Sequence, residues 1–149
     1  MRIRKGYTFI ELLMVLCIIS ILFLIMTKGI KGYKRLENDI VVEQCSNSIM
    51  TFIYSCREYC YLNKVEGYIL CDQVSNTFSF YTGSSRKQIL RLPQGFELDL
   101  LNTASQNQRI NIDYKGFTSD ACTIKYFDLY GIEHKLTISV GTAYVEIKN

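Results

Sequence analysis

The stretch that decides the fold of this chain is MRIRKGYTFIELLMVLCIISILFLIMT, residues 1–27. Residues 7–27 form a run of 21 residues, of which 17 are hydrophobic, and Glu11 is the one acidic or basic residue in that run. As an α-helix with a rise of about 1.5 Å per residue, the run would be about 31 Å long, which matches a bilayer core of about 30 Å. The stretch therefore predicts a single transmembrane helix.

The net charge of the chain is concentrated in front of this run. The 149 residues include 17 Lys and Arg against 14 Asp and Glu, a formal net charge of +3. Arg2, Arg4 and Lys5 account for that excess, so residues 7–149 are formally neutral. The 48% hydrophobic content and the single long apolar run argue against a disordered chain and against a protein with several membrane spans. The neutral remainder argues against a generally basic nucleic-acid-binding protein.

Glu11 is the anomaly of the apolar run. A carboxylate inside a membrane costs on the order of a few kcal/mol and normally has a partner. In the first turn of a helix it would also meet the positive end of the helix dipole. Residues 7–27 contain no Lys, Arg or His. A cationic partner would therefore come from another chain or from a new amino terminus.

The stretch RKGYTFIEL, residues 4–12, resembles the class III signal of type IV prepilins and pseudopilins. In that family a short basic leader ends in Gly, a bulky residue begins the mature chain, and Glu is the fifth mature residue. The resemblance implies that a prepilin peptidase cuts between Gly6 and Tyr7 and methylates the new amino group of Tyr7. It also implies that this amino group pairs with Glu11 of a neighbouring subunit and sets the register of the assembly. The family's usual first mature residue is Phe, and Tyr7 is a conservative departure.

The same resemblance implies a topology and a set of partners. The leader, residues 1–6, would lie in the cytoplasm. The chain after residue 27 would lie outside the cytoplasmic membrane, and later in a pilus or pseudopilus on the cell surface. The partners would be the peptidase, other pilin or pseudopilin subunits, membrane lipid, and an assembly platform protein with its ATPase.

Four cations follow the apolar run, at Lys28, Lys31, Lys34 and Arg35. We interpret them as a collar that faces lipid headgroups rather than as a specific lipid or DNA contact.

Beyond the run, apolar residues keep a helical spacing as far as Cys60. Their positions are Leu36, Ile40, Cys45, Ile49, Phe52, Cys56 and Tyr59 or Cys60. No proline interrupts residues 7–63, although Gly29 and Gly32 weaken the helix between its two halves. We therefore expect one long helix, membrane-spanning over residues 7–27 and amphipathic over residues 28–63, with a hinge at residues 27–32.

From residue 64 onward the pattern changes to that of β-strands. Short alternating segments separated by turn residues predict seven or eight strands, at residues 68–71, 77–81, 88–92, 96–101, 109–114, 123–129, 136–140 and 143–147. The short connections favour antiparallel hairpins. The predicted fold class is α+β, with the long amino-terminal helix packed on an extracytoplasmic antiparallel β domain of residues 64–149.

The last third of the chain is similar to the carboxy-terminal hairpins of GspH/FimT-like minor pseudopilins. The similarity covers residues 112–117, residues 122–124, Gly131 and residues 136–145. Lys115-Gly116 stands where that family has an aspartate-glycine turn. The similarity implies a minor rather than a major subunit.

The six cysteines leave three interpretations open. Cys17 lies in the apolar run and is most simply an apolar filler. Cys56 and Cys60 share a helix face, and outside the cytoplasm each could form a disulfide with a strand cysteine such as Cys71 or Cys122. Buried free thiols are favoured over one disulfide. A metal site formed by Cys56, Cys60, Cys71 and the single His134 is favoured least, because no CxxC pair supports it.

Nothing in the sequence predicts catalysis or a cofactor. There is one histidine, no Gly-rich phosphate loop, and no Ser or Cys in a nucleophile motif. The carboxylates Glu97, Asp99, Asp113 and Asp128 alternate with apolar residues, as solvated positions on the outer face of a sheet would. The 11 Tyr and 8 Phe are expected in the strand core and in cross-strand pairs rather than in a platform that stacks single-stranded nucleic acid.

We interpret the chain as a minor pilin-like subunit, a pseudopilin, of a type IV pilus-like envelope machine. Its richness in Ile, Lys, Asn and Tyr points to an AT-rich genome, and so favours a competence pseudopilus for DNA uptake or a type IV pilus. The alternatives are a type II secretion pseudopilin, a DNA-binding module at the tip of such a filament, and a single-span anchored protein that is never processed. The formally neutral mature chain gives DNA binding no support.

Overall fold

The computed structural model describes residues 8–99, 101–103, 108–119, 121–139 and 145–148, without the side chains of residues 25–31, 102–103 and 145–148. The chain forms two compact units, Met1–Asp39 and Ile40–Asn149.

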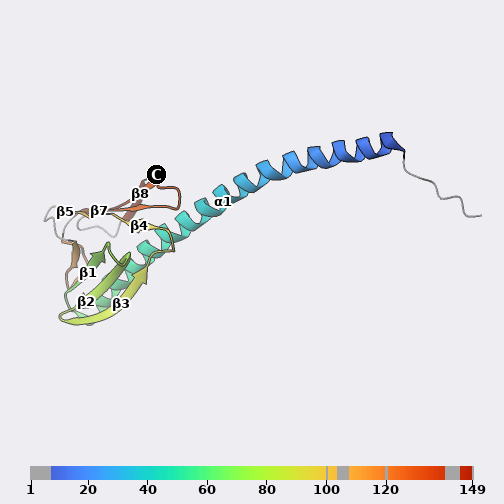
Figure 1. Cartoon of the computed structure of the whole chain (residues 1–149). Coiled ribbons are helices and arrows are strands. Elements are labelled where there is room, and N and C mark those ends of the chain that lie inside the picture. Colours follow the sequence, from blue (N-terminus) through green and yellow to red (C-terminus); the bar gives the residue numbers. More distant parts are fainter. Residues whose placement is uncertain (1–7, 100, 104–107, 120, 140–144, 149) are drawn as a thin grey trace, which may run out of the picture. The chain divides into compact units, whose positions relative to one another are not determined.

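One continuous α-helix, α1 (Phe9–Asn63), accounts for all the helical structure of the described residues (Figure 1). The expectation of a single long helix is confirmed. The backbone stays α-helical through residues 27–32, so the hinge expected there is not a break in the helix. Each glycine costs a helix about 1 kcal/mol relative to alanine, which is too little to end a helix of 55 residues.

Within the second unit, one face of α1 is buried. The buried apolar residues on this face are Cys45, Ile49, Phe52, Ile53, Cys56 and Cys60. Their spacing places them on one stripe of the helix. Leu36 and Ile40, the first two positions of the predicted stripe, are exposed instead. The fully buried apolar stripe therefore begins at Cys45, and Val41 and Val42 before it are half-buried against the same core.

Four strands form the first sheet, in the order β3-β2-β1-β6. They are β1 (Gly67–Asp72), β2 (Thr77–Thr82), β3 (Ser85–Arg91) and β6 (Arg109–Ile112), and each pair is antiparallel. Alternate residues point inward and are buried, at Ile69, Cys71, Phe78, Phe80, Ile110 and Ile112. The register of β2 with β3 shifts between Phe80 and Tyr81, which makes Lys87 an extra residue on β3.

The second sheet has the order β4-β7-β8-β9, and β5 also pairs with β7. Its strands are β4 (Glu97–Leu98), β5 (Asn102–Thr103), β7 (Cys122–Phe127), β8 (Glu133–Ile138) and β9 (Val145–Lys148). Of the strand predicted at residues 96–101, the described residues form the two-residue strand β4. Leu98 and Leu101 are both buried three positions apart, which breaks the alternation that a strand needs.

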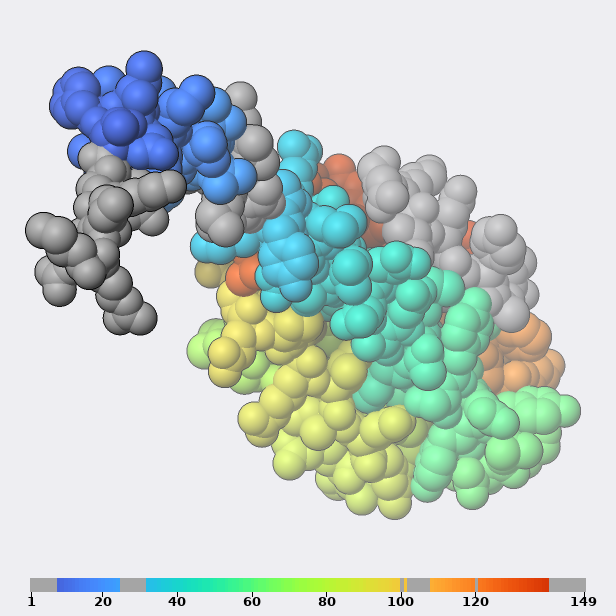
Figure 2. All heavy atoms as spheres, turned by 90° about the vertical axis from the view of Figure 1, so that its right-hand side faces the viewer, coloured from blue at the N-terminus to red at the C-terminus, as the bar shows by residue number. Residues whose placement is uncertain are grey.

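The helix stripe and the inner faces of both sheets share one hydrophobic core. On the face shown in Figure 2, the cyan residues of α1 lie beside the yellow residues of β3. The fold class is α+β, a long helix packed on an antiparallel β domain, as predicted.

Candidate subunit-assembly site

Glu11 lies in the first turn of α1 and is hydrogen-bonded to Thr8, the residue before the helix. The Thr8 backbone N–H donates to Glu11 Oε2 over 2.8 Å, and Thr8 Oγ1 donates to the same oxygen over 3.0 Å. The Glu11 N–H lies 3.4 Å from Thr8 Oγ1, which accepts from it. This arrangement is a capping box, in which two residues satisfy each other's free helix-end groups. Sequence reasoning assigned no role to Thr8, although the Thr-x-x-Glu spacing is the signature of this motif.

The capping box leaves one carboxylate oxygen of Glu11 available. Both hydrogen bonds from Thr8 reach Oε2, and Oε1 accepts none from any described residue. The Glu11 side chain is exposed. Glu11 can therefore keep its helix cap and still receive a cation from another molecule.

The helix around Glu11 exposes apolar side chains in all directions. The exposed fraction of the large hydrophobic residues from Phe9 to Leu24 ranges from 45% at Leu13 to 77% at Phe9. The one hydroxyl there, Ser20 Oγ, donates to Leu16 O over 2.8 Å and so is bonded within the helix. A helix that is apolar all round is normally buried in other apolar material. This surface therefore requires apolar surroundings, and it carries one carboxylate.

Other predicted features of this segment lie outside the described residues. These are the expected cleavage point between Gly6 and Tyr7, the methylation of Tyr7, and the side chains of Lys28 and Lys31. Lys34 and Arg35 are described and exposed.

Among the residues that the structure describes, no helix contains an apolar stretch of the length that crossing a membrane requires.

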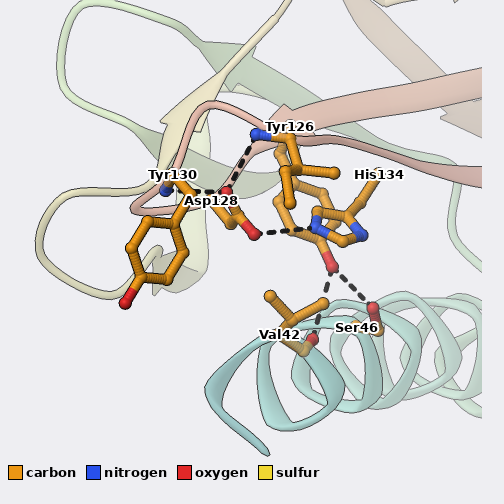
Figure 3. Close-up of polar contacts among 7 residues, drawn as sticks. Val42, Ser46, Tyr126, Asp128, Tyr130 and His134 are labelled. Atoms are coloured by element: carbon orange, nitrogen blue, oxygen red, sulfur yellow. Dashed lines mark hydrogen bonds and ion pairs between the residues drawn. The ribbon is translucent and has the colours of Figure 1, made fainter. Parts of the chain in front are cut away.

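Tyr126 ties the second sheet to α1 (Figure 3). Its hydroxyl lies 2.6 Å from Ser46 Oγ and donates to Val42 O over 3.3 Å. Tyr126 is fully buried among the core side chains. Burial raises the pKa of Tyr126 to about 12, although the hydrogen bond with Ser46 acts in the opposite direction. The phenol is therefore neutral and serves as a structural link.

Asp128 is buried, so the expectation that it is a solvated sheet residue is wrong. It stands after the end of β7, where its Oδ1 accepts the N–H groups of Tyr130 at 2.8 Å and Ile132 at 2.9 Å. Its Oδ2 lies 3.3 Å from His134 Nε2, and the His134 ring stacks on Tyr126 with centroids 5.3 Å apart (Figure 3). This carboxylate builds the turn between β7 and β8.

The other three carboxylates expected on the outer face differ in exposure. Glu97 is exposed, and Asp99 and Asp113 are half-buried. Asp113 also builds a turn, because its Oδ1 accepts the N–H groups of Lys115 at 2.9 Å and Phe117 at 2.8 Å.

Cys17 is an exposed free thiol, and Cys45, Cys56, Cys60 and Cys71 are buried free thiols. Cys122 is buried in the same core. Burial raises the pKa of Cys56 to about 12 and that of Cys60 to about 11. Burial, and then the neighbouring Cys122, raise the pKa of Cys71. Thiols held protonated are poor nucleophiles and poor metal ligands. Within the described residues no three His, Cys, Asp or Glu side chains are grouped as a metal ion would need.

No protein-family model matches the chain. No curated protein matches it by sequence.

Solved structures do resemble it. The chain is similar to the minor pseudopilin EpsH from the type 2 secretion system of Vibrio cholerae, with a TM-score of 0.56 and 12% identity over 71% of this chain and 94% of that one. A second EpsH structure gives a TM-score of 0.53 and 13% identity over 68% and 89%. The type IV minor pilin FimU of Pseudomonas aeruginosa strain PAO1 gives a TM-score of 0.56 and 9% identity over 78% and 91%.

These structures agree with the architecture reached from the sequence. At such low identity the similarity concerns the fold. The long helix and the antiparallel β domain of this chain have the fold of the type IV pilins and pseudopilins.

Proposed function

We propose that the chain is a minor pilin-like subunit, a pseudopilin, of a type IV pilus-like envelope machine. The observation that carries the proposal is the exposed apolar surface of residues 9–24 with the single carboxylate of Glu11 at its start. The fold shared with EpsH and FimU supports it. The role is structural and non-enzymatic: the helix packs against the helices of other pilin-like subunits, which supply the apolar surroundings that this surface requires.

Maturation and assembly follow from the same proposal. Prepilin peptidase cuts between Gly6 and Tyr7 and methylates Tyr7. Residues 7–27 anchor the chain in the cytoplasmic membrane, with residues 28–63 and 64–149 outside, until the platform protein and its ATPase move the subunit into the filament. There the cationic amino group of one subunit meets Glu11 Oε1 of the next. Opposite charges attract strongly in apolar surroundings, and an unpaired charge is costly there, so the pair fixes the register.

For the machine, we favour a competence pseudopilus for DNA uptake or a type IV pilus over type II secretion. The support is compositional: the chain is rich in Ile, Lys, Asn and Tyr and has one Pro. The genes next to this one in the native genome test the choice. Competence is supported if genes for a prepilin peptidase, a platform protein and an ATPase lie there together with genes for DNA-uptake proteins. The same three genes beside a gene for the outer-membrane channel of a secretion system contradict it.

The maturation step is tested by mass spectrometry of the protein from its native host. The expected amino terminus is a methylated Tyr7. An intact leader beginning at Met1 would show that the chain is an unprocessed single-span protein.

The assembly step is tested with Glu11→Gln. Glutamine keeps an oxygen that can accept the hydrogen bonds of Thr8, so the cap survives while the charge is lost. We expect cleavage to proceed and the amount of subunit in sheared filaments to fall. The matched control is Glu37→Gln, which removes an exposed carboxylate from the same helix. Equal amounts of both variants in filaments would remove the argument for pairing between subunits.

A further inference from the structure

The second unit contains a groove between α1 and β3. It has a volume of about 650 Å³, and Gln88, Ile89 and Leu90 form its β3 wall. A smaller hollow of about 160 Å³ continues it past Arg91 to Pro93. Both walls lie on the face shown in Figure 2. The groove therefore runs along residues 88–91 of β3 and on to Pro93.

One side of β3 has no neighbouring strand among the described residues, because β3 ends the strand order of its sheet. The backbone N–H and C=O groups on that side form a template to which another strand can add. The seven residues of β3 make it long enough for such a pairing.

The α1 wall of the groove is polar. Gln44, Asn47, Ser48 and Thr51 line it with exposed amide and hydroxyl groups. An amphipathic partner helix would need a mainly apolar wall, and Phe52 is the one apolar residue on the α1 wall of the larger groove. The amide and hydroxyl groups suit the polar side chains of an extended polypeptide.

The outer face of β3 presents a cation, an apolar residue and a second cation. Gln88 bonds to Ser55 of α1 and Leu90 packs on the core, so both point inward. Ile89 and Arg91 alternate with them and point outward, and Arg86 lies opposite Tyr81 on the same outer face.

The spacing along this face can be read from β2. Arg86, Ile89 and Arg91 pair with Tyr81, Ser79 and Thr77, which are two residues apart on a regular strand. A strand on the free side of β3 would therefore meet them with residues that are also two apart.

The positive charge of this edge is not neutralised within the described residues. Arg86 and Arg91 are exposed, as is Lys87 at the bulge, and no described carboxylate forms an ion pair with any of them. Cations on an edge strand repel strands of the same charge and attract acidic ones.

We propose that β3 binds an extended strand of another protein in which carboxylates stand two residues to either side of an apolar residue. The carboxylates face Arg86 and Arg91, and the apolar residue faces Ile89. The alternate residues of the bound strand, which are small and polar, face the groove wall of α1. The inference goes beyond the subunit role and stands without it, since it uses only residues of the second unit.

The same cations could contact phosphates of a nucleic acid, but two observations favour a peptide. The groove runs beside free backbone groups, which recognise another backbone and not a phosphate chain. The chain after its leader is also formally neutral. Nucleic-acid binding is therefore left as an outcome of the test.

The test uses the full chain in an uncharged detergent and two labelled peptides, Ser-Glu-Thr-Ile-Thr-Glu-Ser and its counterpart with Lys for each Glu. We expect the acidic peptide to bind and the basic one not to bind. In the variant Arg86→Glu/Arg91→Glu, two cross-strand pairs change from attractive to repulsive. The affinity of this variant for the acidic peptide should fall about tenfold or more, and the variant should bind the basic peptide instead. Lys64→Glu/Lys115→Glu, with the same charge change away from β3, should bind the acidic peptide as before. Fluorescence anisotropy measures the affinities.

Amide hydrogen exchange provides the second readout. Strand addition should slow exchange in residues 85–91 when the acidic peptide is present. The proposal is overturned if the acidic peptide does not bind at about 1 mM, or if the two peptides bind equally well. It is also overturned if Lys64→Glu/Lys115→Glu loses as much affinity for the acidic peptide as Arg86→Glu/Arg91→Glu does. It is also overturned if residues 85–91 gain no protection, or if an oligothymidylate protects them while the peptide does not.

Discussion

The hydroxyl of Tyr126 on β7 lies 2.6 Å from the hydroxyl of Ser46 on α1, and both residues are buried. A buried hydroxyl needs a partner, because an unsatisfied one costs roughly 1–3 kcal/mol. The pair, with Val42 O as a second acceptor at 3.3 Å, therefore holds β7 at one position along the helix. A shift of the sheet by one helical turn would leave the Tyr126 and Ser46 hydroxyls without each other.

Tyr126→Phe should destabilise the second unit by about 1–3 kcal/mol, since it leaves Ser46 Oγ buried without its partner. The midpoint of thermal unfolding, followed by circular dichroism, should fall by several degrees.

Two controls separate the hydrogen bond from the ring. Tyr130→Phe removes a hydroxyl from a residue that is 56% exposed, and should leave the midpoint nearly unchanged. The double variant Ser46→Ala/Tyr126→Phe should lose less free energy of unfolding than the sum of the losses of the two single variants, because no buried hydroxyl is then left without a partner. Strict additivity would mean that the two hydroxyls do not stabilise each other.

The long helix was predictable because its signals are local. Residues 9–63 contain no proline, and apolar residues recur at helical spacing. The exposure of Leu36 and Ile40 was not predictable, because it depends on where the sheets begin to cover the helix and not on the spacing of apolar residues. The same holds for β4 and β5, whose two residues each are set by pairing with β7.

The turn role of Asp128 had a sequence signal that was not used. Asp113 and Asp128 each begin a segment Asp-x-x-Gly followed by an apolar residue. In both segments the Asp Oδ1 accepts two backbone N–H groups, and the glycine has a positive φ, 79° at Gly116 and 74° at Gly131. Treating the carboxylates as alternating strand residues missed this repeated turn, since its spacing of three is not that of a strand.

Asp128→Ala should destabilise the chain by about 1–3 kcal/mol, because two backbone N–H groups lose their acceptor beside a buried site. Asp128→Asn keeps an oxygen at the position of Oδ1 and should recover most of the loss. Urea denaturation midpoints compare the three chains. If Asn and Ala were equally damaging, the contact of Oδ2 with His134, and not the turn, would be what Asp128 supplies.

Gly116→Ala should be more damaging than Gly131→Ala. Both glycines have a positive φ, which costs a residue with a Cβ about 1–2 kcal/mol. At Gly131 an added Cβ meets nothing within 4 Å, whereas at Gly116 it would lie 2.8 Å from the backbone oxygen of Arg57 on α1. Arg57 Nε also donates to Gly116 O over 2.8 Å, so the turn cannot move away without losing that bond. Thermal unfolding of both variants tests the difference, and equal midpoints would show that the turn relaxes freely.

The buried thiols predict that stability falls at alkaline pH. Burial raises the pKa of Cys45 and Cys56 in the folded chain from an ordinary 9.0 to about 12. The unfolded chain therefore releases these protons at a lower pH than the folded chain does, so the stabilisation is complete below about pH 9 and is lost as the pH rises toward 12. The urea midpoint of the wild-type chain should fall between pH 8 and about pH 11.

In Cys45→Ala/Cys56→Ala the midpoint should be lower at pH 8, because two core side chains are shortened, but its further fall with pH should be smaller. Lysine and tyrosine also titrate in this range, so the difference between the two slopes is the measurement that counts. Parallel slopes would mean that the thiols are not held neutral by the core.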